Sequence, residues 1–432
     1  MRQASDDGRG APDAGRATRF SAAARSTGGF DRLLRTLRAI CRCSRRPKGR
    51  FSSHDATRNL ENVGYIATGV AHQREDRSMG KMTFAAALGA CTAIAIASAQ
   101  AAVVLVSGSI QGAVNQAKPG DIILVAPGTY RETVYVLKDD ITILGPESAV
   151  IDARGFANGI HVGADIFAQG PNPTCPAVAV KNFTLIGLTI QNAVNNGIFL
   201  SGVDGYTLTK GTYLNNGEYA TYPSCSNNGQ ISFNYTKGGG DTCIYVGNDV
   251  EASIIGNSAS ECTVGVQIVN SDDVVVRANT VTGNSTGVLA IVDPFNPRTE
   301  TSNVLIAANR INDNNRPNTS RDEDLARLPS GVGVLVVGSD NVKIRRNEVT
   351  GNSTWGVAIT YNPLASEDLR IDPNPDNNEV RLNVVLRNGA HPSSALTGAD
   401  LFYDGSGQAN CFAQNRFATS VPANIEAIYP CH

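Results

Sequence analysis

Residues 265–279 read GVQIVNSDDVVVRAN, and residues 333–347 repeat this pattern as GVLVVGSDNVKIRRN. Both copies run on into the sequence TGNST, after which the pattern begins again at Gly287 and at Gly356. The step from one copy to the next is 22 residues in the first case and 23 residues in the second. Such a step is too short for a domain and is typical of one coil of a solenoid.

Each period holds three short apolar pieces, such as residues 266–268, residues 274–276 and Val281, separated by Gly, Asn, Asp and Ser. Three brief strands with a turn after each make one triangular rung. A single rung cannot bury its inward Val, Ile and Leu side chains, so rungs stack and bury a continuous apolar column. The sequence therefore predicts an all-β, single-stranded parallel β-helix of about ten to twelve rungs.

Asparagines recur at a fixed offset within the period. The motif Asn-x-Val/Ile-x-x-Asn begins at Asn279, Asn309, Asn347 and Asn383, and Asn415 begins a last, partial copy. Asn tolerates left-handed backbone angles, and its amide can bond the Asn of the next rung. These positions therefore predict sharp corners and ladders of side chains.

The first part of the coil is predicted from shorter signals. Ile110, Val114 and Ala117 follow Ser109 at helical spacing, which predicts a short helix over residues 109–118 that caps the open end of the column. Such a cap would cover an edge that is prone to aggregation. Early strands are expected at residues 122–125, 134–136, 141–144, 149–151, 159–162, 197–200 and 244–246.

Residues 1–78 differ in composition from the rest of the chain. They contain 16 basic and 8 acidic residues, few apolar runs and no period. A basic arm for nucleic acid or a transit peptide is one interpretation. The sequence that follows favours another, in which residues 1–78 are a disordered or spurious N-terminal extension.

Residues 79–101 have the arrangement of a secretory signal peptide. A short basic start with Lys81 precedes an apolar stretch over residues 84–97, and Ala99-Gln100-Ala101 offers a small-x-small cleavage site. The apolar stretch is too short for a membrane span. Attachment of a lipid at Cys91 is the alternative. We expect an exported protein, secreted or periplasmic, whose structured domain is residues 102–432.

The expected mature chain is acidic. Residues 102–432 contain 20 basic and 31 acidic residues, so the net charge is −11. Such a surface does not suit the phosphate backbone of a nucleic acid. It also repels an anionic polysaccharide, except at a local basic patch or through a bound cation.

Six cysteines remain after the expected cleavage, and an even number in an exported chain favours disulfides. The sequence alone leaves fifteen pairings open. Our preferred set joins two loops, clamps two neighbouring rungs and closes the C-terminal end, through the pairs Cys175–Cys225, Cys243–Cys262 and Cys411–Cys431.

Interruptions of the period gather at the borders of the Gly-Val-x-Ile strand. One group directly follows this strand, at residues 163–177, 293–302 and 362–378, and a second group directly precedes it, at residues 218–241 and 315–330. Loops at both borders of one strand column would form the walls of a long groove.

Alternation along the strands predicts the floor of this groove. The outward residues on successive rungs would be His161, Phe199, Tyr245, Gln267, Leu289, Leu335 and Ala358. Aromatic faces beside amides suit a sugar ring, so Phe199, Tyr245 and Gln267 are the expected substrate-binding residues. The alternative is that the wall loops cover this apolar floor and make it a second core.

Together with the repeat and the signal peptide, the opening segment resembles that of exported right-handed parallel β-helix repeat proteins of the pectate lyase-like superfamily. It reads Ile110-Gln111-x-Ala113-Val114, then Gly120-Asp121, Val125-x-Pro127-Gly128-Thr129-Tyr130 and Glu132. The resemblance covers residues 107–420. It implies a right-handed coil and, as ligand, an acidic polysaccharide of the uronate type, without naming a reaction.

Enzyme motifs of that superfamily are matched only in part. Residues 240–244 read GDTCI, which is similar to the GDDCI of polygalacturonases with one aspartate replaced. Residues 293–296 read DPFN, which is similar to the DPHD of mannuronan epimerases with Phe295 in place of the basic histidine. The segment ending in Glu132 is similar to an opening motif of pectinesterases. An ordinary turn would explain each match equally well.

A lyase needs a base and a cation that neutralises the uronate carboxylate. The candidate bases near the predicted groove are His161, Lys237, Tyr245 and Arg298. The candidate ligands for a cation such as Ca²⁺ are Asp241, Asp249 and Asp293.

Two functions of different class remain open. The first is a polysaccharide lyase or epimerase that works around Tyr245, Asp241 and Asp293. The second is a non-catalytic carbohydrate-binding or envelope protein that uses the same coil as a rigid surface. Nucleic acid is not an expected partner, and the sequence does not show the oligomeric state.

Overall fold

The computed structural model describes residues 101–165, 173–393 and 395–432. The predicted extension over residues 1–78, and residues 79–100 of the predicted signal peptide, lie outside these ranges. Among the described residues, no helix has the length and apolar character needed to cross a membrane.

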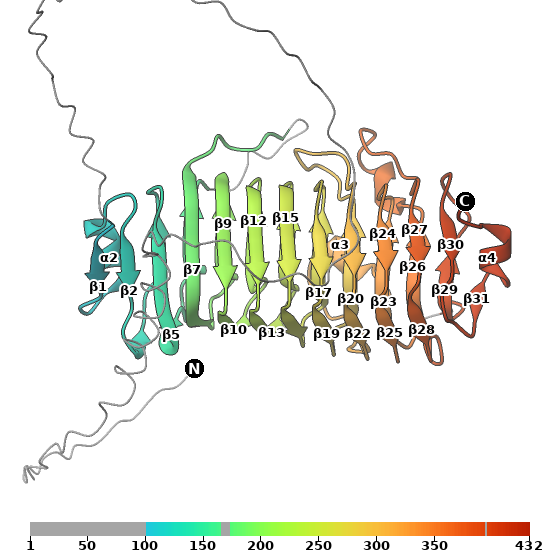
Figure 1. The fold of residues 1–432 in the computed structure, drawn as a ribbon, viewed down its shortest axis with the longest axis horizontal. Helices are drawn as coiled ribbons and strands as arrows, with labels where there is room; N and C mark the ends of the chain where they lie inside the picture. The colour runs from blue at the N-terminus through green and yellow to red at the C-terminus, as the bar shows by residue number, and fades with distance from the viewer. Residues whose placement is uncertain (1–100, 166–172, 394) are drawn as a thin grey trace, which may run out of the picture. The chain divides into compact units, whose positions relative to one another are not determined.

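The described chain winds into a coil of parallel strands that lie side by side along one axis, with α2 at one end and α4 at the other (Figure 1). One side of the coil is an 11-stranded sheet, here called the front sheet, and this number agrees with the ten to twelve predicted rungs. Its strands are β4 (Val134–Val136), β6 (Asn158–Gly163), β8 (Asn196–Ser201), β11 (Thr221–Ser224), β14 (Thr242–Gly247), β17 (Val264–Val269), β20 (Thr286–Ile291), β23 (Val332–Val337), β26 (Trp355–Thr360), β29 (Ala399–Tyr403) and β31 (Ser420–Val421).

The other two sides form one 20-stranded sheet. Its strands are β1 (Val103–Leu105), β2 (Ile122–Leu124), β3 (Gly128–Tyr130), β5 (Thr142–Asp152), β7 (Val180–Gln191), β9 (Val203–Thr209), β10 (Thr212–Asn216), β12 (Asn227–Ser232), β13 (Tyr235–Gly239), β15 (Val250–Ile255), β16 (Ser258–Ser260), β18 (Val275–Arg277), β19 (Thr280–Thr282), β21 (Leu305–Ala307), β22 (Arg310–Asn312), β24 (Lys343–Arg345), β25 (Glu348–Thr350), β27 (Glu379–Arg381), β28 (Val384–Leu386) and β30 (Cys411–Ala413). Inward Val, Ile and Leu side chains fill the coil as one continuous core. The all-β parallel solenoid predicted from the repeat is confirmed.

The predicted asparagine ladder is present in the interior. Asn279 donates from its Nδ2 to Oδ1 of Asn309 at 3.0 Å, and its main-chain N–H donates to the same oxygen at 2.9 Å. The Nδ2 group also donates to the main-chain oxygen of Ile254. This pattern continues through seven asparagines, namely Asn234, Asn257, Asn279, Asn309, Asn347, Asn383 and Asn415. A second ladder runs through Asn284, Asn314, Asn352 and Asn388.

The prediction that these asparagines adopt left-handed angles is wrong. The left-handed residue is the one before each asparagine, as at Ala278 (φ 55°) and Leu382 (φ 59°). The asparagine itself must keep its N–H and its side chain directed along the axis to join the ladder. The sharp corner therefore falls on its predecessor.

A glycine in the front sheet faces each asparagine of the second ladder. A Cβ atom on Gly333 would lie 2.9 Å from Nδ2 of Asn352, and one on Gly265 would lie 2.8 Å from Nδ2 of Asn284. Both pairs are 19 residues apart in the sequence. The glycines of the repeat thus leave room for the amides.

One rung replaces this glycine–asparagine pair with a disulfide. The registers Thr242↔Val264 and Ile244↔Val266 place Cys243 beside Gly265 in the front sheet. Cys262 occupies the ladder position, because its N–H donates to Oδ1 of Asn284 at 3.0 Å. The bond Cys243–Cys262 has the same separation of 19 residues. The other preferred pairs, Cys175–Cys225 and Cys411–Cys431, also form.

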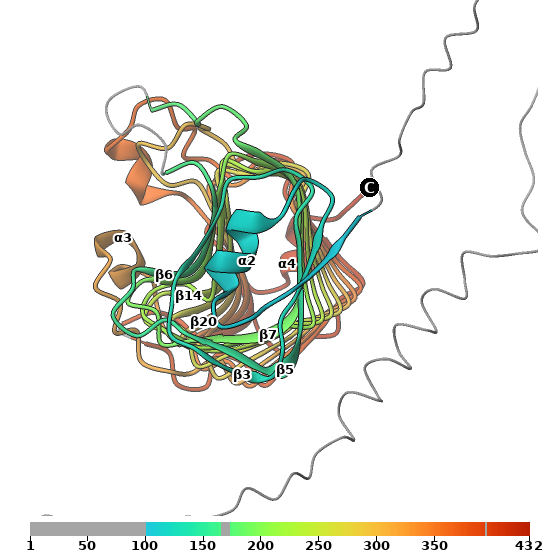
Figure 2. The same cartoon turned by 90° about the vertical axis from the view of Figure 1, so that its left-hand side faces the viewer.

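Residues 218–241 are not an insertion, contrary to the prediction. They contain β11 and continue through β12 and β13, which makes one complete rung. Thr221 and Pro223 replace the usual Val-x-Ile pair, with Tyr222 between them, so the segment does not look like the repeat. The loops over residues 293–302, 315–330 and 362–378 lie outside the coil next to the front sheet, and the last two carry the short helix α3 (Glu323–Ala326) and the 3-10 turn η1 (Pro363–Ser366) (Figure 2). Residues 166–172 of the predicted loop over residues 163–177 lie outside the described ranges.

Both ends of the coil are closed. Helix α2 (Ile110–Gln116) begins after Ser109, whose side chain accepts from the N–H of Gly112, as predicted. Glu132 accepts from the N–H groups of Ile110 and Gln111, so this residue of the pectinesterase-like segment fixes the helix. At the other end lies α4 (Ile425–Ile428), and the two ladders finish on the carboxylates of Glu426 and Asp400.

Replacing Gly333 with alanine tests the packing between glycine and asparagine. We expect Gly333→Ala to lower the free energy of unfolding by about 1–3 kcal/mol, because the new methyl group has no room in a filled interior. It would clash with Cγ1 of Val349 and lie 2.5 Å from the main-chain oxygen of Gly356 and 2.9 Å from Nδ2 of Asn352. Gly112→Ala is the matched control, since its Cβ would make ordinary contacts in α2 and alanine favours a helix. Chemical denaturation measures the free energy of unfolding of both variants. Equal stability of the two variants would contradict this account.

The disulfide can be exchanged for the pair that it replaces. We expect the double variant Cys243→Gly with Cys262→Asn to be more stable than Cys243→Ala with Cys262→Ala, because the amide restores the ladder bond and the glycine makes room for it. Both variants lack the cross-link, so thermal unfolding isolates the packing effect. A less stable glycine–asparagine variant would show that Cys262 does not occupy a ladder position.

Candidate functional site

A row of side chains runs along the outer face of the front sheet, one from each strand between β4 and β29. The strand registers align the predicted members and add Tyr135, Tyr222 and Phe402, giving Tyr135, His161, Phe199, Tyr222, Tyr245, Gln267, Leu289, Leu335, Ala358 and Phe402. Its first half is aromatic. Ring centroids lie 5.3 Å apart for Tyr135 and His161, 4.8 Å for His161 and Phe199, and 4.6 Å for Tyr222 and Tyr245.

Most of the row is covered, as the alternative interpretation expected. Phe199, Tyr245 and Gln267, the expected substrate-binding residues, are only 6%, 7% and 2% exposed. Leu325 of α3 packs with Leu289, Leu335 and Trp355 in a buried cluster outside the coil. The loop over residues 315–330 that carries α3 is held across the sheet, where Arg327 bonds Glu367 at 2.6 Å. These rungs therefore form a second core, and Leu289 is fully buried.

A cavity of about 720 Å³ opens beside the aromatic half of the row. Its lining includes Glu218, Tyr219 and Asp241, which precede strands β11 and β14, and residues 319–322 of the covering loop. Tyr219 stacks on Tyr222 with their centroids 4.4 Å apart. The cavity thus brings carboxyl groups next to aromatic faces.

Asp241 is the most perturbed carboxyl group in this cavity. It is only 6% exposed, and burial raises its pKa to about 7. Hydrogen bonds from the hydroxyl groups of Thr242 and Tyr219 oppose this rise, whereas the charges of Asp322 and Glu218 add to it. Asp241 therefore exchanges its proton near neutral pH, as a general acid or base must.

Thr242 connects Asp241 to the floor of the row. Its Oγ1 lies 2.9 Å from Oδ1 of Asp241 and 2.5 Å from Oε1 of Gln267. A hydroxyl group has one proton, so it donates to one of these oxygens at a time. When Asp241 is protonated, it can donate to Thr242, which then donates to Gln267.

Asp293 approaches the same tyrosines from the other border of the sheet. Burial raises its pKa to about 8, with further contributions from Asp324, Asp322 and Asp241. The phenol of Tyr245 is affected by both carboxyl groups: burial mainly raises its pKa, and the charges of Asp293 and Asp241 add to that. The structure thus brings three predicted site residues, Tyr245, Asp241 and Asp293, into one electrostatic group.

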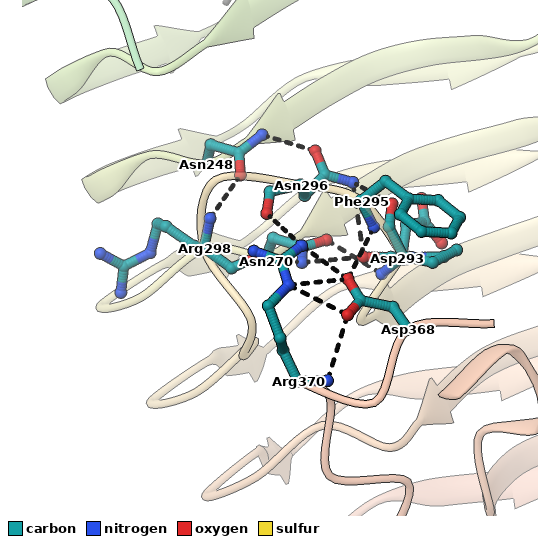
Figure 3. A network of polar contacts seen from close by, with 9 residues as sticks. Asn248, Asn270, Asp293, Phe295, Asn296, Arg298, Asp368 and Arg370 are labelled. Carbon is teal, nitrogen blue, oxygen red and sulfur yellow. Dashed lines mark hydrogen bonds and ion pairs between the residues drawn. The ribbon is translucent and has the colours of Figure 1, made fainter. Parts of the chain in front are cut away.

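A polar network holds the turn that carries Asp293 (Figure 3). Asn270 accepts from the N–H of Asp293 at 2.9 Å and donates to its main-chain oxygen at 3.1 Å. Asp368 accepts from the N–H of Phe295 at 2.9 Å and pairs with Arg370 at 2.6 Å. That pairing lowers the pKa of Asp368 to about 2. The DPFN segment is therefore a fixed turn that leaves Phe295 exposed.

Comparison with known proteins supports the architecture. A family model described as "Right handed beta helix region" matches residues 178–298. The chain is a right-handed parallel β-helix protein. No curated protein sequence matches it.

Several solved structures share this fold. The A-module of mannuronan C-5 epimerase AlgE4 from Azotobacter vinelandii is 15% identical with a TM-score of 0.50, covering 70% of this chain and 88% of that one. DFA-IIIase from Arthrobacter chlorophenolicus A6 is 13% identical with a TM-score of 0.49, covering 76% and 87%. An alginate lyase from Paenibacillus sp. str. FPU-7 is 13% identical with a TM-score of 0.42, covering 74% and 98%. At 15% identity, the likeness to the AlgE4 module shows the fold alone.

Other predicted site residues of this β-helix lie apart from the Asp241 cavity. Lys237 is on β13, outside the front sheet, and pairs with Glu261 at 3.0 Å. Arg298 lies 3.8 Å from Asp272, and its Nε atom is buried without a hydrogen-bond partner among the described residues. His161 belongs to the aromatic row, where its Nε2 lies 2.9 Å from the main-chain oxygen of Ala164.

The three predicted cation ligands do not converge. Asp249 is fully buried inside the coil, where its carboxylate accepts from the N–H of Ser226 at 2.7 Å and lies 2.9 Å from the hydroxyl oxygen of Tyr206. It therefore faces away from Asp241 and Asp293. Within the described ranges, no group of three His, Cys, Asp or Glu side chains is placed to hold a metal ion.

Sequence reasoning missed Tyr219, Tyr222 and Glu218. All three lie in the rung that was taken for an insertion. The 23-residue steps from Gly197 to Ala220 and from Ala220 to Cys243 were a signal that could have located them.

The buried acid Asp249 predicts a pH dependence of stability. Burial raises its pKa from 3.8 to about 8, so the folded chain binds an extra proton between these values and loses stability as the pH rises through this range. Asn at this position stays neutral. We expect the melting temperature of Asp249→Asn to fall less than that of the wild type between about pH 5 and pH 8.

Asp368→Asn is the control for this experiment. The pKa of Asp368 is lowered, so its contribution to stability is lost only as the pH falls below about 4. This variant should change the melting temperature by a similar amount across the same pH range. Parallel curves for Asp249→Asn and the wild type would show that Asp249 is ionised in the folded chain.

Proposed function

We propose that this protein binds a glycan on the aromatic half of the front sheet and modifies it with Asp241 as the general acid. The observation that carries the proposal is Asp241 itself. It is a buried carboxyl group with a pKa near 7, it lines a cavity of about 720 Å³, and it contacts Tyr219. Carboxyl groups tuned in this way are typical of sites that transfer protons.

The binding part rests on the tyrosines. Tyr219 lines the cavity and is partly exposed, whereas Tyr222 and the buried Tyr245 pack against it, with ring centroids 4.4 Å and 5.1 Å from that of Tyr219. A pyranose ring stacks its C–H face on such rings and exchanges hydrogen bonds with nearby polar groups. Further along the row, Phe199 and His161 are buried and Tyr135 is half-exposed, so Tyr135 offers a separate aromatic face near the end of the coil.

The proposed reaction needs a base besides the acid Asp241. Glu218 lines the same cavity and is exposed, so it is the candidate base. A protonated Asp241 could deliver its proton to a glycosidic oxygen while an ionised Glu218 activates water or removes a proton from the sugar. Hydrolysis, elimination and epimerisation all draw on such a pair, and the product distinguishes them.

The charge of the cavity bears on the type of glycan. Uronate polymers are the proposed substrates, in keeping with the mannuronan epimerase and alginate lyase that share the fold. Asp241, Glu218 and Asp322 would repel a uronate carboxylate unless a cation lies between them, and Arg321 is a cationic side chain that lines the same cavity. The described residues do not bring three such ligands together, so calcium here would need ligands from the glycan as well.

A non-catalytic glycan-binding protein is the second candidate. The covering loop over residues 315–330 buries half of the row, and Leu325 occupies the floor above Leu289 and Leu335. A short, partly closed surface of this kind suits recognition without turnover. In either case the three disulfides support an exported, secreted or periplasmic protein.

Asp241→Asn separates binding from chemistry. On alginate, polygalacturonate and dextran, with and without calcium, we expect product from the wild type as unsaturated ends, altered uronates or new reducing ends. The variant should lose product formation by about a hundredfold or more and keep its affinity. Because the acid must be protonated, the wild-type rate should fall as the pH rises above about 7.

Asp273→Asn is the matched control. Asp273 lies in an exposed turn whose equivalent in the second copy is Asn341, so the change should leave both product and binding unaltered. Binding without product from the wild type would eliminate the enzyme and leave the second candidate. Absence of binding to every polymer would eliminate both.

A further inference from the structure

A group of basic side chains lies at the corner between the second and third strands of successive rungs. We name it the basic corner, and its members are Arg310, Lys343, Arg345, Arg346, Arg381 and Arg416. Strand registers and one isolated bridge place them on four consecutive rungs. Strand β5 turns this same corner in its own rung. In Figure 2 the bend of β5 lies at the bottom of the coil, whereas α3 lies outside the coil on the left. The basic corner is therefore remote from the Asp241 cavity.

The coil does not require basic residues at these positions. Arg345 is in register with Ala307, and further rungs carry Arg277, Ile255 and Ser232 at the same place. The position of Lys343 is likewise taken by Leu305, Val275 and Ser253. Apart from Arg277, the rungs compared carry no basic side chain at these two positions, so the coil itself does not require one there.

Like and opposite charges both face each other across these strands. Arg345 and Arg381 lie directly opposite each other, where like charges repel, whereas Lys343 lies directly opposite Glu379. Glu379 pairs with Arg345 at 2.8 Å, and Glu348 pairs with Arg310 at 3.2 Å. Among the described residues, no acidic side chain forms an ion pair with Lys343, Arg346, Arg381 or Arg416.

The geometry suits an extended polyanion. Parallel strands are about 4.8 Å apart, so the cations form short rows along the axis of the coil. Leu382 and Val384 lie between them, with exposures of 40% and 37%. A linear chain of sugar rings offers apolar C–H faces to such residues and carboxylates to the neighbouring arginines. Arginine binds carboxylates through two parallel hydrogen bonds.

We propose that the basic corner is a second carbohydrate site, which binds a carboxylated polysaccharide of the uronate type. It is the local basic surface that an otherwise acidic chain needs to hold a polyanion. The site does not depend on the reaction proposed for the Asp241 cavity. It would keep an acidic polymer attached to one side of the coil while the cavity remains free.

The test measures binding of the full chain to alginate, with dextran as the neutral polymer, over a range of salt concentrations. The variant is Lys343→Gln with Arg346→Gln and Arg416→Gln, and Gln414 already occupies the equivalent left-handed position to Arg346. We expect it to bind alginate at least about tenfold more weakly at low salt, with a smaller salt dependence. The wild type should bind dextran far less than alginate at this site.

The matched control is Arg131→Gln with Lys181→Gln and Lys210→Gln, which removes the same charge from exposed positions on the N-terminal rungs. It should change alginate affinity by less than about twofold. Circular dichroism and melting temperature show whether each variant is folded. Equal losses in both variants would mean that net charge alone matters and would overturn the proposal.

Three further results would also overturn it. Alginate binding that survives in the corner variant but is lost in Tyr222→Ala would place the polymer in the groove. Equal binding of dextran and alginate would exclude recognition of carboxylates. Corner-dependent binding to vesicles of anionic phospholipid, without binding to alginate, would make the partner a membrane surface. Asp241→Asn should leave alginate binding at the corner intact, which separates this proposal from the previous one.

Discussion

The stacking of the rungs depends on asparagine side chains that point into the coil. In the second ladder, each of these amides packs beside a glycine of the front sheet, where a larger side chain would not fit. Each asparagine of the ladders bonds the next rung through its side chain and satisfies main-chain groups that would otherwise be buried without partners. In the second ladder, a Cβ on Gly265 or Gly333 would meet a valine methyl group, a main-chain oxygen and the amide, so these positions require glycine. The ladders help to set the register of the rungs that carry them, and a fixed register decides which side chains point outward.

The candidate site follows from that register. Alternation along the front sheet places one outward side chain per rung, so residues far apart in the sequence meet in one row. The chemistry appears only where the row is flanked by carboxyl groups and partly covered by the loop over residues 315–330. Burial then raises the pKa values of Asp241 and Asp293 into the neutral range. The coil thus aligns the outward side chains, and the loops bury the carboxyl groups of Asp241 and Asp293 and so raise their pKa values.

Much of the fold, but less of the candidate site, could be predicted from the sequence. The period, the ladder and the capping helix were readable because they repeat or follow local rules, and the outward row followed from alternation. The loops have no period, so the cover formed by Leu325 and the position of Asp322 were not readable. Asp249 was assigned to the groove because its place just after β14 does not show which way its side chain points. Tyr222 was missed because an unusual sequence replaced the repeat in its rung.

The polarity of the asparagine ladders gives the coil a beginning and an end. Every Oδ1 accepts from the rung before it, so each new rung must present an acceptor to the last one. Glu426 and Asp400 meet this demand with carboxylates that offer no amide to a further rung. Whole rungs could therefore be duplicated or removed in the interior during evolution, which would lengthen or shorten the outer surface while the terminal stop is preserved.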